Sequence, residues 1–128
     1  MKEKVLYWID LSDYDVETAA AMQMSGRFLY VGFMCHQAIE KILKAYYVFI
    51  TADTPPHSHS LAYLAKKSQL YDLFTLDQQE FIDMLEPLQI EARYPSHKEQ
   101  ILKSLTEERC KTILTQTKEL QRWIKMKL

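Results

Sequence analysis

The chain has 128 residues, of which 48% are hydrophobic and 26% charged, so it can form one domain, residues 1–128, with a proper core. Two glycines and four prolines are too few for the frequent turns of an all-β protein. A net charge of −1 argues against a strongly basic surface for nucleic acid, although it leaves room for a local patch.

Residues 4–24 predict the first helix, with acidic residues in its N-terminal half, where the helix dipole favours them. Ser25 and Gly26 should form a break, because glycine readily takes the left-handed conformation that ends many helices. So short a turn makes the next helix, predicted over residues 27–51, antiparallel to the first.

The helix predicted over residues 27–51 carries two apolar stripes instead of one. A narrow polar face remains between them, made of Gln37, Glu40, Lys41 and Lys44. The first stripe contains Leu29, Gly32, His36, Ile39, Leu43, Tyr46 and Ile50, and the second contains Val31, Cys35, Ala38, Ile42, Ala45 and Phe49. Because each stripe needs a cover, we expect the rest of the bundle on one side and a second subunit on the other.

Residues 52–60 predict a loop, since two consecutive prolines stop the long helix there. Ser58 or Ser60 can cap a short third helix over residues 61–69. Residues 71–74 predict a short apolar connection to the next element.

A capping-box pattern from Thr75 to Gln78 predicts the start of a fourth helix. Pro87 lacks a backbone donor and should kink this helix near Asp83. The side chains that we expect it to bury are Phe81, Ile82, Leu85 and Leu88.

Residues 91–100 predict a second break, fixed by Pro95, and Thr106 predicts the start of the last helix. Its apolar face contains Cys110, Ile113, Leu114, Thr117, Leu120 and Ile124. The fold class that follows is all-α: an up-and-down four-helix bundle with one short extra helix.

Cys35 and Cys110 both lie in helical patterns, which is typical of buried thiols and not of a disulfide framework. The N-terminus has no apolar signal core, and no run of 18 apolar residues is present. We therefore expect a cytoplasmic protein that does not contact a membrane.

Several short motifs occur in an order that resembles the HEPN domain family (higher eukaryotes and prokaryotes nucleotide-binding) over nearly the whole chain. The most specific are QAIEK-x-LKA from Gln37, HSL from His59 and RYP from Arg93, taken together. The full order is Trp8, Tyr14-Asp15, Ala19, the turn Gly26-Arg27-Phe28, Phe33-x-x-His36-Gln37-Ala38-Ile39-Glu40-Lys41-x-Leu43-Lys44-Ala45, Pro56, His59-Ser60-Leu61-x-x-Leu64, Arg93-Tyr94-Pro95 and Trp123.

This resemblance implies a compact helical bundle that is usually a homodimer in the prokaryotic cytoplasm. Many such proteins are encoded beside a minimal nucleotidyltransferase and act as toxin–antitoxin-like pairs. Many members are RNases, and others bind nucleotide or RNA without cleaving it.

In the RNase members of this family, four to six residues separate an Arg from a His. The His acts as general base or acid at the 2′-hydroxyl, and the Arg stabilises the charge that develops on the phosphate. The nearest match here is Arg93 and His97, with three residues between them and Pro95 among these. They are the candidate catalytic pair. The alternative is that Arg93 caps carbonyls at the end of a helix or pairs with an acid.

The candidate ligand-binding residues are Arg93, Tyr94, His36, Gln37, Glu40, Lys41 and His59. His36 also fits a plain core histidine, and the lysines of the polar face are usually solvated. His57 and His59 would need a third ligand at metal-site spacing, and none is present, so we expect no metal. With Gly26 and Gly32 as the only glycines, neither a P-loop nor a dinucleotide motif fits, and we expect no cofactor.

Three hypotheses remain open on the sequence. The first is a homodimeric nucleotide- or RNA-binding module that pairs with a nucleotidyltransferase. The second is a metal-independent endoribonuclease toxin that uses Arg93 and His97. The third is a helical interaction module with no ligand.

Overall fold

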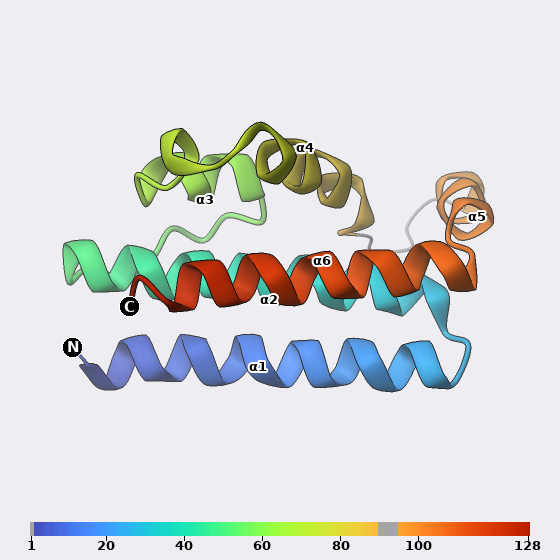
Figure 1. The fold of residues 1–128 in the computed structure, drawn as a ribbon, viewed down its shortest axis with the longest axis horizontal. Helices are drawn as coiled ribbons and strands as arrows, with labels where there is room; N and C mark the ends of the chain where they lie inside the picture. The colour runs from blue at the N-terminus through green and yellow to red at the C-terminus, as the bar shows by residue number, and fades with distance from the viewer. Residues whose placement is uncertain (1, 90–94) are drawn as a thin grey trace.

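The computed structural model describes residues 2–89 and 95–128, with side chains for 2–89 and 98–128. These residues form six α-helices and two 3₁₀ helices, and no strand occurs among them (Figure 1). The α-helices are α1 (Lys2–Met24), α2 (Phe28–Thr51), α3 (Leu61–Lys67), α4 (Leu76–Leu85), α5 (Pro95–Ser104) and α6 (Glu107–Lys125), and the 3₁₀ helices are η1 (Tyr71–Leu73) and η2 (Glu86–Leu88). The all-α prediction is confirmed.

The turn between α1 and α2 is a Schellman motif. Gly26 has a φ of 74°, its N–H donates to the Gln23 carbonyl at 3.3 Å, and the Arg27 N–H donates to the Met22 carbonyl at 2.8 Å. The predicted break at Ser25 and Gly26 is therefore confirmed, and α2 runs back antiparallel to α1 (Figure 1).

Helix α2 is the central element of the fold. Helices α1 and α6 pack along it, and the layer formed by α3, η2 and α4 covers another side (Figure 1). Both of its apolar stripes are buried within the single chain over most of their length, as Val31, Ile39 and Ile42 show with no exposed area, but Phe49 and Ile50 at the C-terminal end of α2 are exposed. The central part of each stripe is covered by α1, α6 and the α3–α4 layer of the same chain, so a second subunit does not cover a whole stripe, and only its C-terminal end stays exposed.

Gly32 allows a close approach in the middle of this packing. A Cβ atom at Gly32 would lie 3.2 Å from the Leu88 Cδ1 atom of η2 and 3.4 Å from the Leu105 Cδ1 atom. A larger residue would therefore push both leucines away from α2.

Side-chain caps begin three of the helices. The Ser60 hydroxyl accepts from the Tyr63 N–H at the start of α3, so Ser60 is the cap of the two candidates, and Thr106 caps α6 by accepting from the Arg109 N–H. Thr75 and Gln78 form both hydrogen bonds of the predicted capping box at the start of α4.

Two predictions near prolines are wrong. Helix α5 occupies residues 95–104, where a break was predicted, because proline fits the first helical position, which needs no hydrogen-bonded N–H. Pro87 does not kink α4 near Asp83. Instead α4 ends at Leu85, and Pro87 lies in η2, since it cannot donate to the carbonyl four residues earlier.

Candidate functional site

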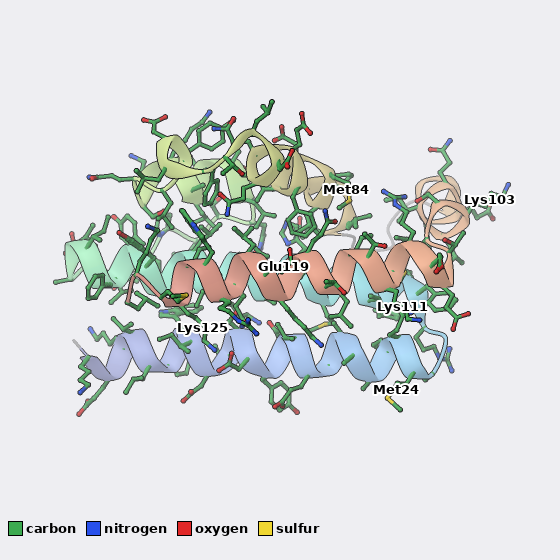
Figure 2. The ribbon with its side chains drawn as sticks, in the orientation of Figure 1. Met24, Met84, Lys103, Lys111, Glu119 and Lys125 are labelled. Carbon is green, nitrogen blue, oxygen red and sulfur yellow. The ribbon has the colours of Figure 1, made fainter. Side chains whose placement is uncertain are left out.

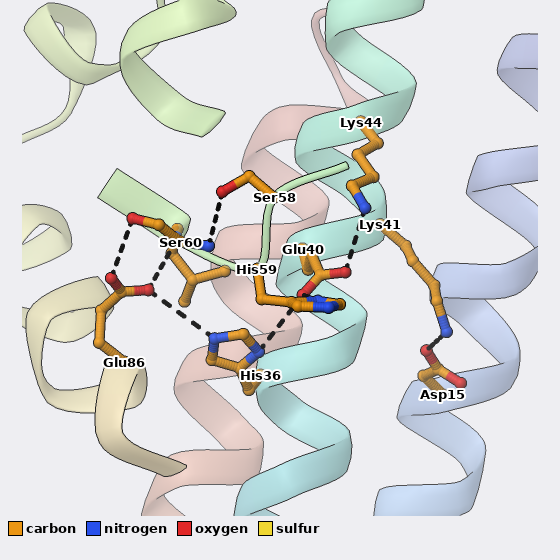
Figure 3. A network of polar contacts seen from close by, with 10 residues as sticks. Asp15, His36, Glu40, Lys41, Lys44, Ser58, His59, Ser60 and Glu86 are labelled. Carbon is orange, nitrogen blue, oxygen red and sulfur yellow. Dashed lines mark hydrogen bonds and ion pairs between the residues drawn. The ribbon is translucent and has the colours of Figure 1, made fainter. Parts of the chain in front are cut away.

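A buried cluster of polar side chains lies where α2 meets the loop before α3 and the end of α4 (Figure 3). Its centre is His36 and Glu40, which have 0% and 3% of their surface exposed. Residues four apart lie on the same face of a helix, so α2 presents His36, Glu40 and Lys44 in one row. The cluster is completed by His59 from the loop and Glu86 from the chain after α4.

Glu40 is the hub of this cluster. Its carboxylate accepts from Lys44 Nζ at 3.2 Å and lies 3.1 Å from His59 Nδ1 and 3.8 Å from His36 Nδ1. The expected exposed polar face of α2 is wrong at Glu40 and Lys44, which are both buried. The Lys44 Nζ atom also lies 5.5 Å from the ring centroid of Trp8, so α1 helps to cover it.

Glu86 connects α2 to the start of α3. Its carboxylate accepts from the Leu61 N–H and from the Ser60 hydroxyl, and it lies 3.7 Å from His36 Nε2 (Figure 3). A negative charge is favourable at a helix N-terminus, where N–H groups lack partners. Sequence reasoning missed Glu86, because no local spacing relates it to His36.

His36 is a neutral imidazole at neutral pH. Burial is the main cause that lowers its pKa from 6.5 to about 4, and the neighbouring His59 contributes to the same shift. Neither ring nitrogen has a hydrogen-bond partner among the described side chains, although a carboxylate lies just beyond hydrogen-bond range on each side. The cluster is thus an incompletely satisfied polar network inside the fold.

Two of the predicted ligand-binding residues of α2 do not join this cluster. Lys41 forms an ion pair with Asp15 of α1, on the side of α2 that faces away from His36 (Figure 3). Gln37 is half-buried and takes part in none of the cluster's hydrogen bonds among the described residues. The structure therefore brings together His36, Glu40 and His59 from the predicted set.

The family model of the HEPN domain matches residues 5–127, which is nearly the whole chain. The chain belongs to the HEPN domain family. No curated protein and no solved structure matches it. The central helix with the QAIEK motif and the loop with the HSL motif, which carried the resemblance, are the two segments that meet in the buried cluster.

The candidate catalytic pair of this HEPN protein lies largely outside the described residues. Arg93 and Tyr94 are outside them, and His97 belongs to α5 but its side chain is outside them too. Lys98, next in α5, lines a pocket of about 240 Å³ with Arg27 and Tyr30 at the start of α2.

The described residues restrict the chemistry that this HEPN protein can perform. Among the described residues, no group of three or more His, Cys, Asp or Glu side chains could hold a metal ion. Burial raises the pKa of the Cys35 thiol to about 12, so this thiol is no nucleophile. No helix within residues 2–89 and 95–128 is both long and apolar enough to cross a bilayer.

The buried histidine predicts a pH-dependent stability. Because the folded pKa of His36 is about 4 and the ordinary value is 6.5, the unfolded chain binds a proton first as the pH falls. The free energy of unfolding should therefore decrease between about pH 6.5 and pH 4, by on the order of 3 kcal/mol from this group. Urea unfolding at several pH values measures this loss, which His36→Gln should largely remove.

His57→Gln is the matched control. His57 is exposed in the loop before α3, so its replacement should leave the pH dependence of stability unchanged. The opposite result, in which the wild type gains stability over His36→Gln as the pH falls, would show that Glu40 and Glu86 hold a protonated imidazole.

Proposed function

We propose that this HEPN protein is a non-enzymatic module that binds a nucleotide or RNA as a homodimer in the prokaryotic cytoplasm. We also propose that it pairs with a minimal nucleotidyltransferase in a toxin–antitoxin-like system. The observation that carries the proposal is the family match over residues 5–127.

The pocket between the start of α2 and α5 supports binding of an anionic group. Lys98 and Arg27 add two cations at the pocket beside the start of α2. The first turn of α2 has no side-chain cap, so its free N–H groups and the helix dipole also favour a phosphate there. Arg93 would hold such a phosphate with two parallel hydrogen bonds.

The spacing of Arg93 and His97 supports binding over cleavage. Three residues separate them, fewer than in the RNase members that the sequence resembles, and Pro95 stands among these. A proline disfavours helical backbone at the residue before it, so Pro95 argues against one continuous helix that carries both residues on one face.

Binding of labelled RNA, followed by fluorescence anisotropy, tests the proposal. Arg93→Ala should weaken binding by roughly 10- to 100-fold, the loss expected for charge-assisted hydrogen bonds. His97→Ala should change it little. Lys103→Ala is the control, because Lys103 is exposed on α5 and points away from the bundle (Figure 2).

The second candidate is a metal-independent endoribonuclease, which the Arg93 and His97 pair favours. In that case Arg93→Lys and His97→Ala should each reduce cleavage of total RNA by roughly 100-fold, and EDTA should have no effect. Cleavage by the wild type that disappears in both variants would replace the binding proposal. A wild type that neither binds nor cleaves RNA or nucleotides would favour a plain interaction module.

The proposed homodimer needs an apolar surface that the single chain leaves exposed. Exposed apolar side chains gather at the end of the bundle where α1 begins and α2 ends, among them Leu6 and Phe49. They line a groove of about 420 Å³ together with the C-terminal Leu128. Sedimentation at micromolar concentration should show twice the chain mass, and only a 15.2 kDa species would contradict the dimer.

A further inference from the structure

Three lysines place their ammonium groups over aromatic rings at the end of the molecule opposite α5. Lys66 Nζ lies 5.0 Å from the Tyr71 ring centroid, and Lys127 Nζ lies 4.4 Å from that of Trp123. Lys67 Nζ lies 5.7 Å from the Tyr63 centroid. Helix α3 and the C-terminal end of α6 lie far from α5 (Figure 1).

The rings beneath these lysines are continuous from η1 to α6. The Tyr71 and Phe74 centroids are 6.4 Å apart, and those of Phe74 and Trp123 are 5.5 Å apart with an edge-to-face arrangement. Phe74 is buried and fixes the other two, which are half-buried and keep part of each ring at the surface. A row of aromatic rings thus connects Lys66 to Lys127.

Three acidic residues lie near this row. Asp77 and Glu119 line a groove of about 270 Å³ between α4 and α6, together with Trp123. Asp72 is exposed beside Tyr71. A polyanion would be repelled from the groove, and the side with the three lysines would attract it.

We propose that the surface formed by Tyr63, Lys66, Lys67, Tyr71, Trp123 and Lys127, here the basic aromatic surface, is a second contact for single-stranded RNA. A lysine that leaves its ring to pair with a phosphate frees the aromatic face for a base. The bases of a duplex are stacked on one another, so only a single strand has base faces that can stack on these rings. The inference rests on the proposed function and adds a site remote from the pocket that Lys98 and Arg27 line.

The distance between the two contacts makes the inference measurable. Helix α6 begins next to α5, and its 19 residues extend for about 28 Å to the basic aromatic surface. At about 3.4 Å per phosphate, a stacked strand needs roughly eight nucleotides to cover that length. An RNA of three nucleotides cannot reach both contacts, and one of twelve can.

Dissociation constants for labelled RNAs of three and twelve nucleotides test the inference. A triple variant with Lys66→Gln, Lys67→Gln and Lys127→Gln should bind the longer RNA at least tenfold more weakly than the wild type does, and the shorter RNA equally well. The slope of log affinity against log salt for the longer RNA should decrease in magnitude by about 2, as for three lost phosphate contacts.

The control triple variant carries Lys4→Gln, Lys111→Gln and Lys118→Gln, which removes the same charge from other exposed positions and should keep the wild-type affinity. In a Trp8→Phe background, which leaves Trp123 as the only tryptophan, the longer RNA should quench the fluorescence and the shorter should not.

Equal losses in both triple variants would overturn the inference, because the effect would then be one of overall charge. Unchanged affinity of the first triple variant for the longer RNA would also overturn the inference. If that variant still binds the shorter RNA, the proposed function stays intact. A wild type that binds neither RNA would overturn both.

Discussion

Replacing Gly26 with proline is expected to lower the free energy of unfolding by about 3 kcal/mol or more. Gly26 has a φ of 74°, whereas the proline ring holds φ near −65°. Proline would also remove the N–H that donates to the Gln23 carbonyl at the end of α1. Urea unfolding followed by circular dichroism measures the change.

Gly26→Ala separates the cost of the left-handed backbone from the cost of the lost hydrogen bond, because alanine keeps the N–H. A Cβ atom at this position meets nothing within 4 Å, so alanine should cost only the left-handed backbone, about 1 to 2 kcal/mol. A proline variant with the wild-type midpoint would show that the turn between α1 and α2 does not hold this conformation in solution.

The sequence predicted those features that depend on neighbouring residues. Gly26 ends α1, Thr75 and Gln78 begin α4, and Thr106 begins α6, each through hydrogen bonds that span at most five residues. Such signals are readable because the partner lies within the same short stretch. The helix periodicity likewise identified the buried faces of α2 and α6.

The sequence did not predict what covers each face. The two stripes of α2 indicate that two of its sides are covered. They do not indicate that the cover comes from α1, α6 and the α3–α4 layer of the same chain. Pro95 is ambiguous for a related reason, since proline ends one helix as readily as it begins another. Only the packing of Ile101 and Leu105 against the core shows that α5 is a helix of the bundle.

The candidate site was predictable only in part. His36, Glu40 and His59 stood out because they are polar residues in the motifs that resemble the family. Glu40 and Lys44 have the spacing of an ordinary exposed pair, and only the loop before α3 and Trp8 make the pair buried. Glu86 was missed because the contact to His36 depends on how the chain returns after α4.

Replacing Glu40 with alanine is expected to lower the free energy of unfolding by about 3 to 5 kcal/mol. The substitution leaves the buried Lys44 ammonium without its carboxylate, and it removes the acceptor beside His59. A buried charge that loses its partner keeps its desolvation cost, which is why removal of one partner is so unfavourable. Unfolding in urea at pH 7 measures the loss.

Lys125→Ala is the control for this prediction. Lys125 pairs with Asp13 at 2.7 Å, but 35% and 44% of their side-chain surfaces are exposed, so the pair should contribute less than about 1 kcal/mol. Glu40→Gln should fall between the two, because it keeps the shape and one acceptor of the hub. Equal stabilities of Glu40→Ala and Lys125→Ala would mean that water replaces the carboxylate, and that the cluster opens to solvent at the His59 loop.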